Sequence, residues 1–114
     1  MSELLESLPD LFHGLGTIRV RRMFGGHGVY ADELFFAIVD DGVLYLKADG
    51  LTAPHFEERG LGKFEYVKDG RVMKMAYFTA PEEVFDDPEE ALRWGRMALD
   101  AALRAAHRAP RAAR

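Results

Sequence analysis

A glycine-rich segment follows two arginines in the sequence. The residues are Arg21-Arg22-Met23-Phe24-Gly25-Gly26-His27-Gly28. Glycines let backbone N–H groups approach an anion closely, and a neighbouring guanidinium adds positive charge, so this segment could cradle a phosphate or a carboxylate. A phosphate-binding loop normally leads into a helix N-terminus, however, and strand-forming residues lie on both sides of these glycines. The pattern therefore favours a bulge or a sharp bend in a long strand, with an anion site as the alternative.

Basic side chains form a second candidate site. Arg19 and Arg21 alternate on one face of a predicted strand, Arg22 is adjacent, and Lys47, Lys63 or Lys74 could join them, depending on the strand order. Such a patch could bind nucleic acid, or it could simply keep a solvent-facing strand soluble. The candidate interaction residues are Arg19, Arg21, Arg22, Gly25, Gly26 and Lys47.

Residue types that carry catalysis or bind metals are scarce. There is no cysteine, so thiolate nucleophiles and thiolate metal sites are excluded. The histidines fall in four different predicted elements without ligand spacing, and no serine lies in a Gly-x-Ser-x-Gly elbow. The sequence therefore predicts no catalytic residue, no metal site and no cofactor, and a chain that is not an enzyme. The four histidines are His13, His27, His55 and His107.

The overall charge also limits the function. The 114 residues fit one domain and carry a net charge of −4, which argues against non-specific nucleic-acid binding. Acidic residues gather between 82 and 90, whereas the last eleven residues carry arginines and no acid. The N-terminus is acidic and no long apolar run follows it. We therefore expect neither a signal peptide nor a membrane span, and a cytoplasmic location.

Hydrophobic periodicity and turn residues predict the elements that position these side chains. Asp41-Gly42 and Asp69-Gly70 are typical of tight type I′ hairpins. The predicted fold is an α+β two-layer sandwich with an antiparallel-rich sheet and the order α-β-β-β-α-β-β-α. We expect a single domain over residues 1–109 and a disordered tail over 110–114, because Pro110 should end the last helix. The expected elements are a helix over 4–12, strand segments over 17–31, 34–39 and 43–48, a helix over 51–59, strands over 63–68 and 71–78, and a helix over 88–107.

This layout and several motifs resemble the N-terminal domain of the TfoX/Sxy family, bacterial regulators of natural competence. The resemblance covers about residues 3–106 and implies a fold similar to that of secretion chaperones, a regulatory role and no catalytic residues. Full-length regulators of this family carry a second, C-terminal helical domain with helix-hairpin-helix character, and we expect this chain to be a stand-alone domain without it. The motifs are Arg21 to Tyr30, Phe36-Ala37, Asp41 to Asp49, Phe56, Gly60, Phe64-Glu65-Tyr66, Met75 to Phe78 before Pro81-Glu82-Glu83, and the Trp94 helix.

Three functions are compatible with these observations. The favoured one is a regulatory interaction module that acts through protein contacts, forms a homodimer through an exposed sheet edge or the sheet face, and affects transcription indirectly. The second is a nucleic-acid-binding domain that uses Arg19, Arg21 and Arg22 or the C-terminal arginines. The third is a small enzyme or ligand carrier, for which the sequence specifies no reaction.

Overall fold

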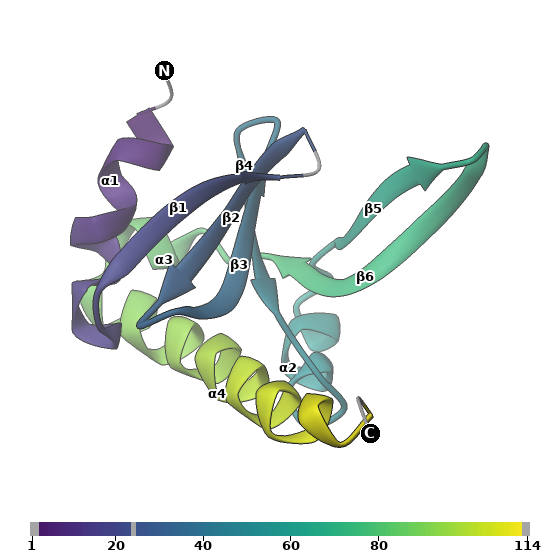
Figure 1. Ribbon diagram of the computed structural model, residues 1–114. Helices are drawn as coiled ribbons and strands as arrows, with labels where there is room; N and C mark the ends of the chain where they lie inside the picture. The colour runs from purple at the N-terminus through teal and green to yellow at the C-terminus, as the bar shows by residue number, and fades with distance from the viewer. Residues whose placement is uncertain (1–2, 24, 113–114) are drawn as a thin grey trace.

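A computed structural model describes residues 3–23 and 25–112, and it shows one sheet with helices packed against it (Figure 1). The six strands lie in the order β1-β2-β3-β4-β6-β5, and each paired neighbour is antiparallel. The α+β class and the antiparallel sheet are as predicted. The elements are α1 (Glu3–Leu11), the 3-10 helix η1 (His13–Leu15), β1 (Ile18–Met23), β2 (Gly26–Ala31), β3 (Leu34–Asp40), β4 (Val43–Lys47), α2 (Ala53–Glu58), β5 (Lys63–Lys68), β6 (Arg71–Thr79), α3 (Glu83–Asp86) and α4 (Pro88–Ala112).

Tight turns connect the hairpins. Asp41 and Gly42 join β3 to β4 with φ angles of 53° and 76°, and Asp69 and Gly70 join β5 to β6 with 54° and 77°. These positive angles belong to the predicted type I′ turns, whose twist matches that of the flanking strands. Both hairpin predictions are confirmed.

The glycine-rich segment corrects the predicted element order. β1 and β2 are two separate strands that pair with each other, with Met23 opposite Gly26 and Gly25 at a φ of 77° in the turn between them. The glycines therefore form a hairpin turn, and the prediction of a bend within one long strand is wrong. Glycine relieves the steric cost of a reversal as well as that of a bulge, so the chain has four strands before α2 where three were predicted.

All the helices contribute to one core on one side of the sheet. Leu8, Phe12, Phe56, Val84 and Trp94 come from successive helical segments and their flanks, and they pack with inward-facing residues of β2, β3, β4 and β6. Small residues on α4 let the helix lie close to its neighbours. At Gly95, an added Cβ would be 2.8 Å from a methyl group of Leu15. This arrangement buries one sheet face, and none of the described helices covers the other.

Helix α4 is longer than predicted. It continues past Pro110 to Ala112, because a proline near a helix end removes one backbone N–H donor without preventing helical φ and ψ angles. The predicted tail therefore begins within the helix, and its last two residues, 113–114, lie outside the described part of the chain.

The β5–β6 hairpin projects from the rest of the molecule (Figure 1). β4 pairs with β6 only between Tyr45–Lys47 and Tyr77–Thr79, whereas β5 pairs with β6 as far as its tip at Lys68 and Arg71. The outer half of the hairpin consequently has no third strand beside it.

Candidate interaction surface

The side of the sheet that faces away from α4 carries an aromatic cluster. Ile38, Phe64 and Tyr77 are buried there, and the half-buried side chains of Phe35, Tyr45, Tyr66 and Met75 pack around them. Every member of this cluster comes from a strand. Strand alternation explains its position, since Ile38 pairs with Tyr45 while their neighbours Val39 and Leu44 face the main core. We call the rings of Tyr30, Phe35, Tyr45, Phe64, Tyr66 and Tyr77 the aromatic face.

The rings of the aromatic face contact one another in two groups. Tyr30 stacks on Phe35 with 5.1 Å between ring centroids, and Phe35 lies 5.6 Å from Tyr77. Phe64 lies 5.0 Å from Tyr45 and 6.1 Å from Tyr66. Such separations are those of favourable aromatic pairs. Five different strands thus combine their side chains into one apolar surface.

A β-bulge sets the position of Phe35. Val29 pairs with Ala37 and Tyr30 pairs with Phe35, so Phe36 is an extra residue on β3. Phe36 and Ala37 consequently both reach the main core, while Phe35 points to the opposite side beside Tyr30. The sequence predicts β3 as a continuous apolar strand and gives no sign of this bulge.

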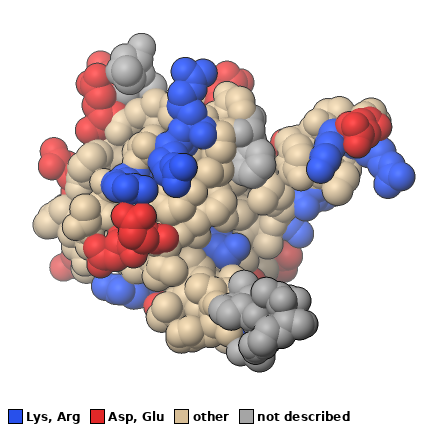
Figure 2. Space-filling model, in the orientation of Figure 1, with Lys and Arg blue, Asp and Glu red and all other residues tan. Residues whose placement is uncertain are grey.

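Basic side chains border the aromatic face. The Arg21 guanidinium lies 5.9 Å from the Tyr30 ring centroid, and the Lys47 ammonium lies 5.0 Å from that of Tyr77, both within cation–π distance. Arg19 forms an exposed ion pair of 3.2 Å with Glu33. Figure 2 shows a group of blue side chains over the region of β1, with acidic side chains close to one end of it.

Burial changes the ionisation of two groups on this surface. Partial burial lowers the pKa of Lys47, although nearby Asp49 opposes the shift and Arg108 adds to it. Burial, with a contribution from Tyr30, raises the pKa of the Tyr77 phenol above its usual range. Tyr77 is therefore an uncharged ring at neutral pH, and its contact with the Lys47 ammonium is a cation–π interaction.

The structure separates the candidate interaction residues. Arg19 pairs with Tyr30 and Arg21 pairs with Gly28, so both arginines lie on the sheet face that carries the aromatic rings. Arg22 lies on the other sheet face, because side chains alternate along a strand. Lys47 lies on the same sheet face as Arg19 and Arg21, but β2 and β3 stand between β1 and β4. The predicted basic residues therefore do not form one patch. Arg19 and Arg21 lie at one border of the aromatic face, and Lys47 lies at another.

The glycines have structural roles in the β1–β2 hairpin. β2 lies between β1 and β3, so the backbone of residues 26–28 takes part in sheet pairing. Gly26 is required for a close approach of strands, since an added Cβ would lie 2.5 Å from the Val39 carbonyl oxygen. Gly25 supplies the positive φ of the turn. The anion site stays a prediction, and the sheet pairing of residues 26–28 leaves fewer of their N–H groups to bind an anion.

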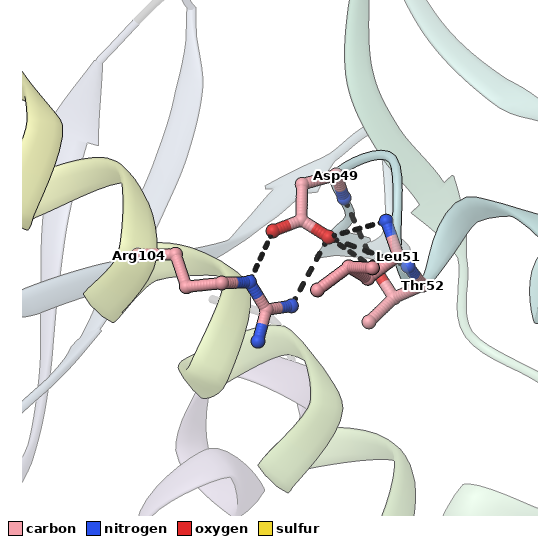
Figure 3. Close-up of polar contacts among 4 residues, drawn as sticks. All are labelled: Asp49, Leu51, Thr52 and Arg104. Atoms are coloured by element: carbon pink, nitrogen blue, oxygen red, sulfur yellow. Dashed lines mark hydrogen bonds and ion pairs between the residues drawn. The ribbon is translucent and has the colours of Figure 1, made fainter.

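The sequence does not reveal a polar contact between Asp49 and Arg104, which lie 55 positions apart. Asp49, in the loop after β4, accepts hydrogen bonds from Arg104 Nε at 2.6 Å and Arg104 Nη2 at 3.1 Å (Figure 3). The backbone N–H groups of Leu51 and Thr52 also donate to Asp49 Oδ1, at 3.1 and 3.3 Å. The Arg104 hydrogen bonds, helped by these N–H groups, lower the pKa of Asp49 to about 2. This contact, the Asp49–Arg104 clasp, joins the β4–α2 loop to α4.

The described part of the chain offers little for catalysis or metal binding. Among residues 3–23 and 25–112, no three His, Asp or Glu side chains gather closely enough to hold a metal ion. None of the helices described there is long and apolar enough to cross a membrane. The most developed surface is the aromatic face with its basic borders, an arrangement suited to binding.

The sequence comparisons agree with this fold. Residues 10–102 match the family model of the TfoX N-terminal domain. The chain belongs to the TfoX N-terminal domain family. This TfoX N-terminal domain is 35% identical over 82 residues to the DNA transformation protein TfoX1 of Aliivibrio fischeri, and 33% identical over 90 residues to protein Sxy of Escherichia coli K12.

These matches cover 72% and 79% of the chain but only 39% and 43% of the two relatives. The TfoX N-terminal domain described here therefore spans less than half the length of the curated relatives it matches. It is related to the TfoX/Sxy competence regulators, a family of regulatory proteins rather than enzymes.

Proposed function

We propose that this domain is a non-enzymatic interaction module that binds a protein partner through the aromatic face and affects transcription indirectly. The observation that supports this most is a sheet face that no described helix covers. Four half-buried rings lie there around the buried Phe64 and Tyr77, and they are those of Tyr30, Phe35, Tyr45 and Tyr66. Half-buried aromatic side chains supply large contact area and are enriched in protein interfaces. Relation to a family of regulators agrees with a role in binding rather than in catalysis.

The charges around the aromatic face suggest the chemistry of the partner. Arg21 and Lys47 stand at two borders of the rings and have no ion-pair partner among the described salt bridges. A partner with an apolar centre flanked by carboxylates would satisfy both cations and cover the rings. Such complementary charges would set orientation and specificity more than total affinity.

The test of this proposal is affinity capture from extracts of the cell that encodes the protein. We expect a specific protein to be retained by the wild-type chain and lost by Arg21→Gln/Tyr30→Thr, which removes one cation and one ring. Arg96→Ala/Leu103→Ala, which changes two exposed residues of α4, is the matched control and should retain it. Equal capture by all three chains, or no specific capture by the wild type, contradicts the proposal.

A homodimer is part of the proposed function, and the projecting β5–β6 hairpin is the segment we assign to it. Val67 and Val72 pair directly across this hairpin and are 70% and 61% exposed. Tyr66 and Met73 form the adjacent cross-strand pair on its other side. A projecting hairpin with one apolar cross-strand pair on each side is suited to packing against a second copy. The cationic β1 edge is less suitable, because arginines discourage edge-to-edge pairing.

Sedimentation velocity over a range of concentrations tests the dimer. Val67→Thr/Val72→Thr keeps two β-branched residues but removes apolar surface, so it should shift the chain toward monomer without unfolding it. Leu51→Thr, at another highly exposed position, is the control and should leave the association unchanged. A wild-type chain that stays monomeric at the highest concentration would refute the dimer.

A specific observation also favours nucleic acid as a second candidate ligand. Single-stranded nucleic acid binds where aromatic rings accept stacked bases beside cationic side chains, and Tyr30 and Phe35 lie next to Arg21. Fluorescence anisotropy with a labelled oligothymidylate tests this, with binding expected at low salt and weakened by Arg21→Gln/Tyr30→Thr. Because phosphate contacts are strongest at low salt, absence of binding there eliminates this candidate.

A further inference from the structure

A second surface lies among the helices, on the side of the sheet opposite the aromatic face. An open groove of about 640 Å³ runs between the α1–η1 segment and the α3–α4 segment. We call it the helical groove. Leu11 and Gly14 line one wall, and Val84, Phe85 and Leu92 line the other. Its volume is in the range of pockets that accept sizeable ligands.

Apolar side chains are exposed in the helical groove without a partner to cover them. Phe85 is 46% exposed and Leu92 is 42% exposed, although both are large hydrophobic residues in helices. Neither belongs to either hydrophobic cluster of the fold. Neighbouring exposed hydrophobic side chains with a polar rim are characteristic of an interaction site.

The rim of the helical groove is acidic. Asp10, Asp86, Asp87 and Glu89 line it, and its lining includes no lysine or arginine. None of these four carboxylates takes part in the ion pairs formed within the described residues. Local helix stability does not explain all of them. Asp87 and Glu89 suit the start of α4, but Asp10 lies in the last turn of α1, where the helix dipole disfavours a carboxylate.

We infer that the helical groove binds an amphipathic helical segment of a partner protein. Its apolar side chains would lie against Phe85 and Leu92, and its lysines or arginines would meet the acidic rim. A helix laid into an apolar groove is an established mode of peptide recognition. Since the aromatic face lies on the other side of the sheet, one molecule could bind partners at both surfaces at once.

A second copy of this chain is a less suitable occupant of the helical groove. The exposed Leu103 and Arg108 near the end of α4 have the required apolar and cationic chemistry. A contact between that end of α4 and the groove of another copy would join two different surfaces, however. Such head-to-tail contacts continue from copy to copy unless a ring closes. A different protein is therefore the assigned partner.

The probe for this proposal is a fluorescein-labelled amphipathic peptide of about 18 residues, with leucine on one helical face and lysine on the other. We expect a Kd below about 100 µM at about 150 mM salt. Asp86→Lys/Glu89→Lys should weaken binding about tenfold or more, since two attractive charges become repulsive. Glu57→Lys/Glu58→Lys makes the same charge change on exposed residues of α2 that do not line the groove, and it should change the Kd less than about threefold.

Three further measurements separate the groove from general attraction between charges. Phe85→Ser should weaken peptide binding about fivefold or more, whereas Leu103→Ser should not, and circular dichroism checks that each variant is folded. Equal affinity for a peptide in which serine replaces leucine, or glutamate replaces lysine, overturns the proposal. So does equal weakening by the two charge-reversal variants. Light scattering that shows concentration-dependent assembly of the wild type, abolished by Asp86→Lys/Glu89→Lys, would assign the groove to a second copy and overturn the assignment to a different partner.

Discussion

Replacing Asp49 with asparagine should destabilise the protein in a pH-dependent way. Asparagine keeps an oxygen that can accept the N–H groups of Leu51 and Thr52, so this change mainly removes the charge that pairs with Arg104. The pKa of Asp49 falls from 3.8 to about 2 on folding, and its side chain is only 16% exposed. At about 1.4 kcal/mol per pKa unit the shift corresponds to about 2.5 kcal/mol. Solvent around the 35%-exposed Arg104 screens the pair, so we expect the charged form to contribute about 1–2 kcal/mol to the free energy of unfolding.

The sign of the pKa shift fixes the pH dependence. Because the folded-state pKa is lowered, the contribution is complete above the unfolded-state pKa near 4 and is lost as the pH falls through about 2. At about pH 3 roughly half of it should remain. Urea unfolding of the wild type and Asp49→Asn at about pH 7 and about pH 3 measures this, and the difference in free energy should fall by about half.

Arg104→Gln provides the matching half of a double-mutant cycle, in which the two substitutions should cost less together than the sum of their separate effects. The reasoning is refuted if Asp49→Asn costs less than about 0.5 kcal/mol at neutral pH, the range of an exposed ion pair. An effect that is equally large at both pH values also refutes it, because a charge-independent loss of packing would then be the cause.

Four other substitutions follow from the backbone and from one buried ring. Gly26→Ala places a Cβ against the Val39 carbonyl oxygen and should lower the free energy of unfolding by about 2–3 kcal/mol. Gly28→Ala meets the end of the movable Met23 side chain and the edge of the Phe35 ring rather than backbone, so it should cost less, about 1–2 kcal/mol, and urea melts that give equal costs would contradict this. Glu33→Gly should raise the melting temperature by a few degrees in calorimetry, since φ is 72° there and the exposed pair with Arg19 contributes little; a lower value would count against strain in the turn. Tyr77→Phe should leave the tyrosinate absorbance gained up to about pH 11 unchanged, because burial raises the pKa of Tyr77. A loss of a quarter of the signal or more would show that this phenol titrates normally, since the pKa of Tyr45, another of the four tyrosines, is also raised.

Short turn motifs in the sequence predict the tight turns well, but they do not predict which strands pair on either side of a turn. Asp41-Gly42 and Asp69-Gly70 determine their own backbone angles, so both hairpins could be predicted from two residues each. Gly25 and Gly26 permit a bulge, a bend or a reversal equally well, and only the pairing of β2 with β1 decides among them. The bulge at Phe36 cannot be predicted from the sequence either, because it depends on the register of β3 with β2 rather than on residue type.

The other features that the sequence does not predict depend on contacts between residues far apart in the chain. Asp49 and Arg104 are 55 positions apart, and each has an adequate local explanation, as a loop residue and as part of the polar face of a helix. The helical groove is similar, because Asp10 and Glu89 line one groove only when α4 packs beside η1, the segment that follows α1. The alternation of Arg19 and Arg21 was visible in the sequence, but the aromatic face beside them requires the strand order.

The position of α4 at the end of the described chain has a consequence for the order of folding during synthesis. All six strands precede Pro88, and the main core is completed by Trp94, Ala98 and Ala102. The ribosome therefore makes every strand before it makes the helix that covers them. Until then Phe36, Leu44 and Leu46 have no cover from α4, and an incomplete chain exposes both sides of its sheet. We expect chains truncated before Trp94 to aggregate or to require a chaperone, because exposed strands and apolar side chains associate readily.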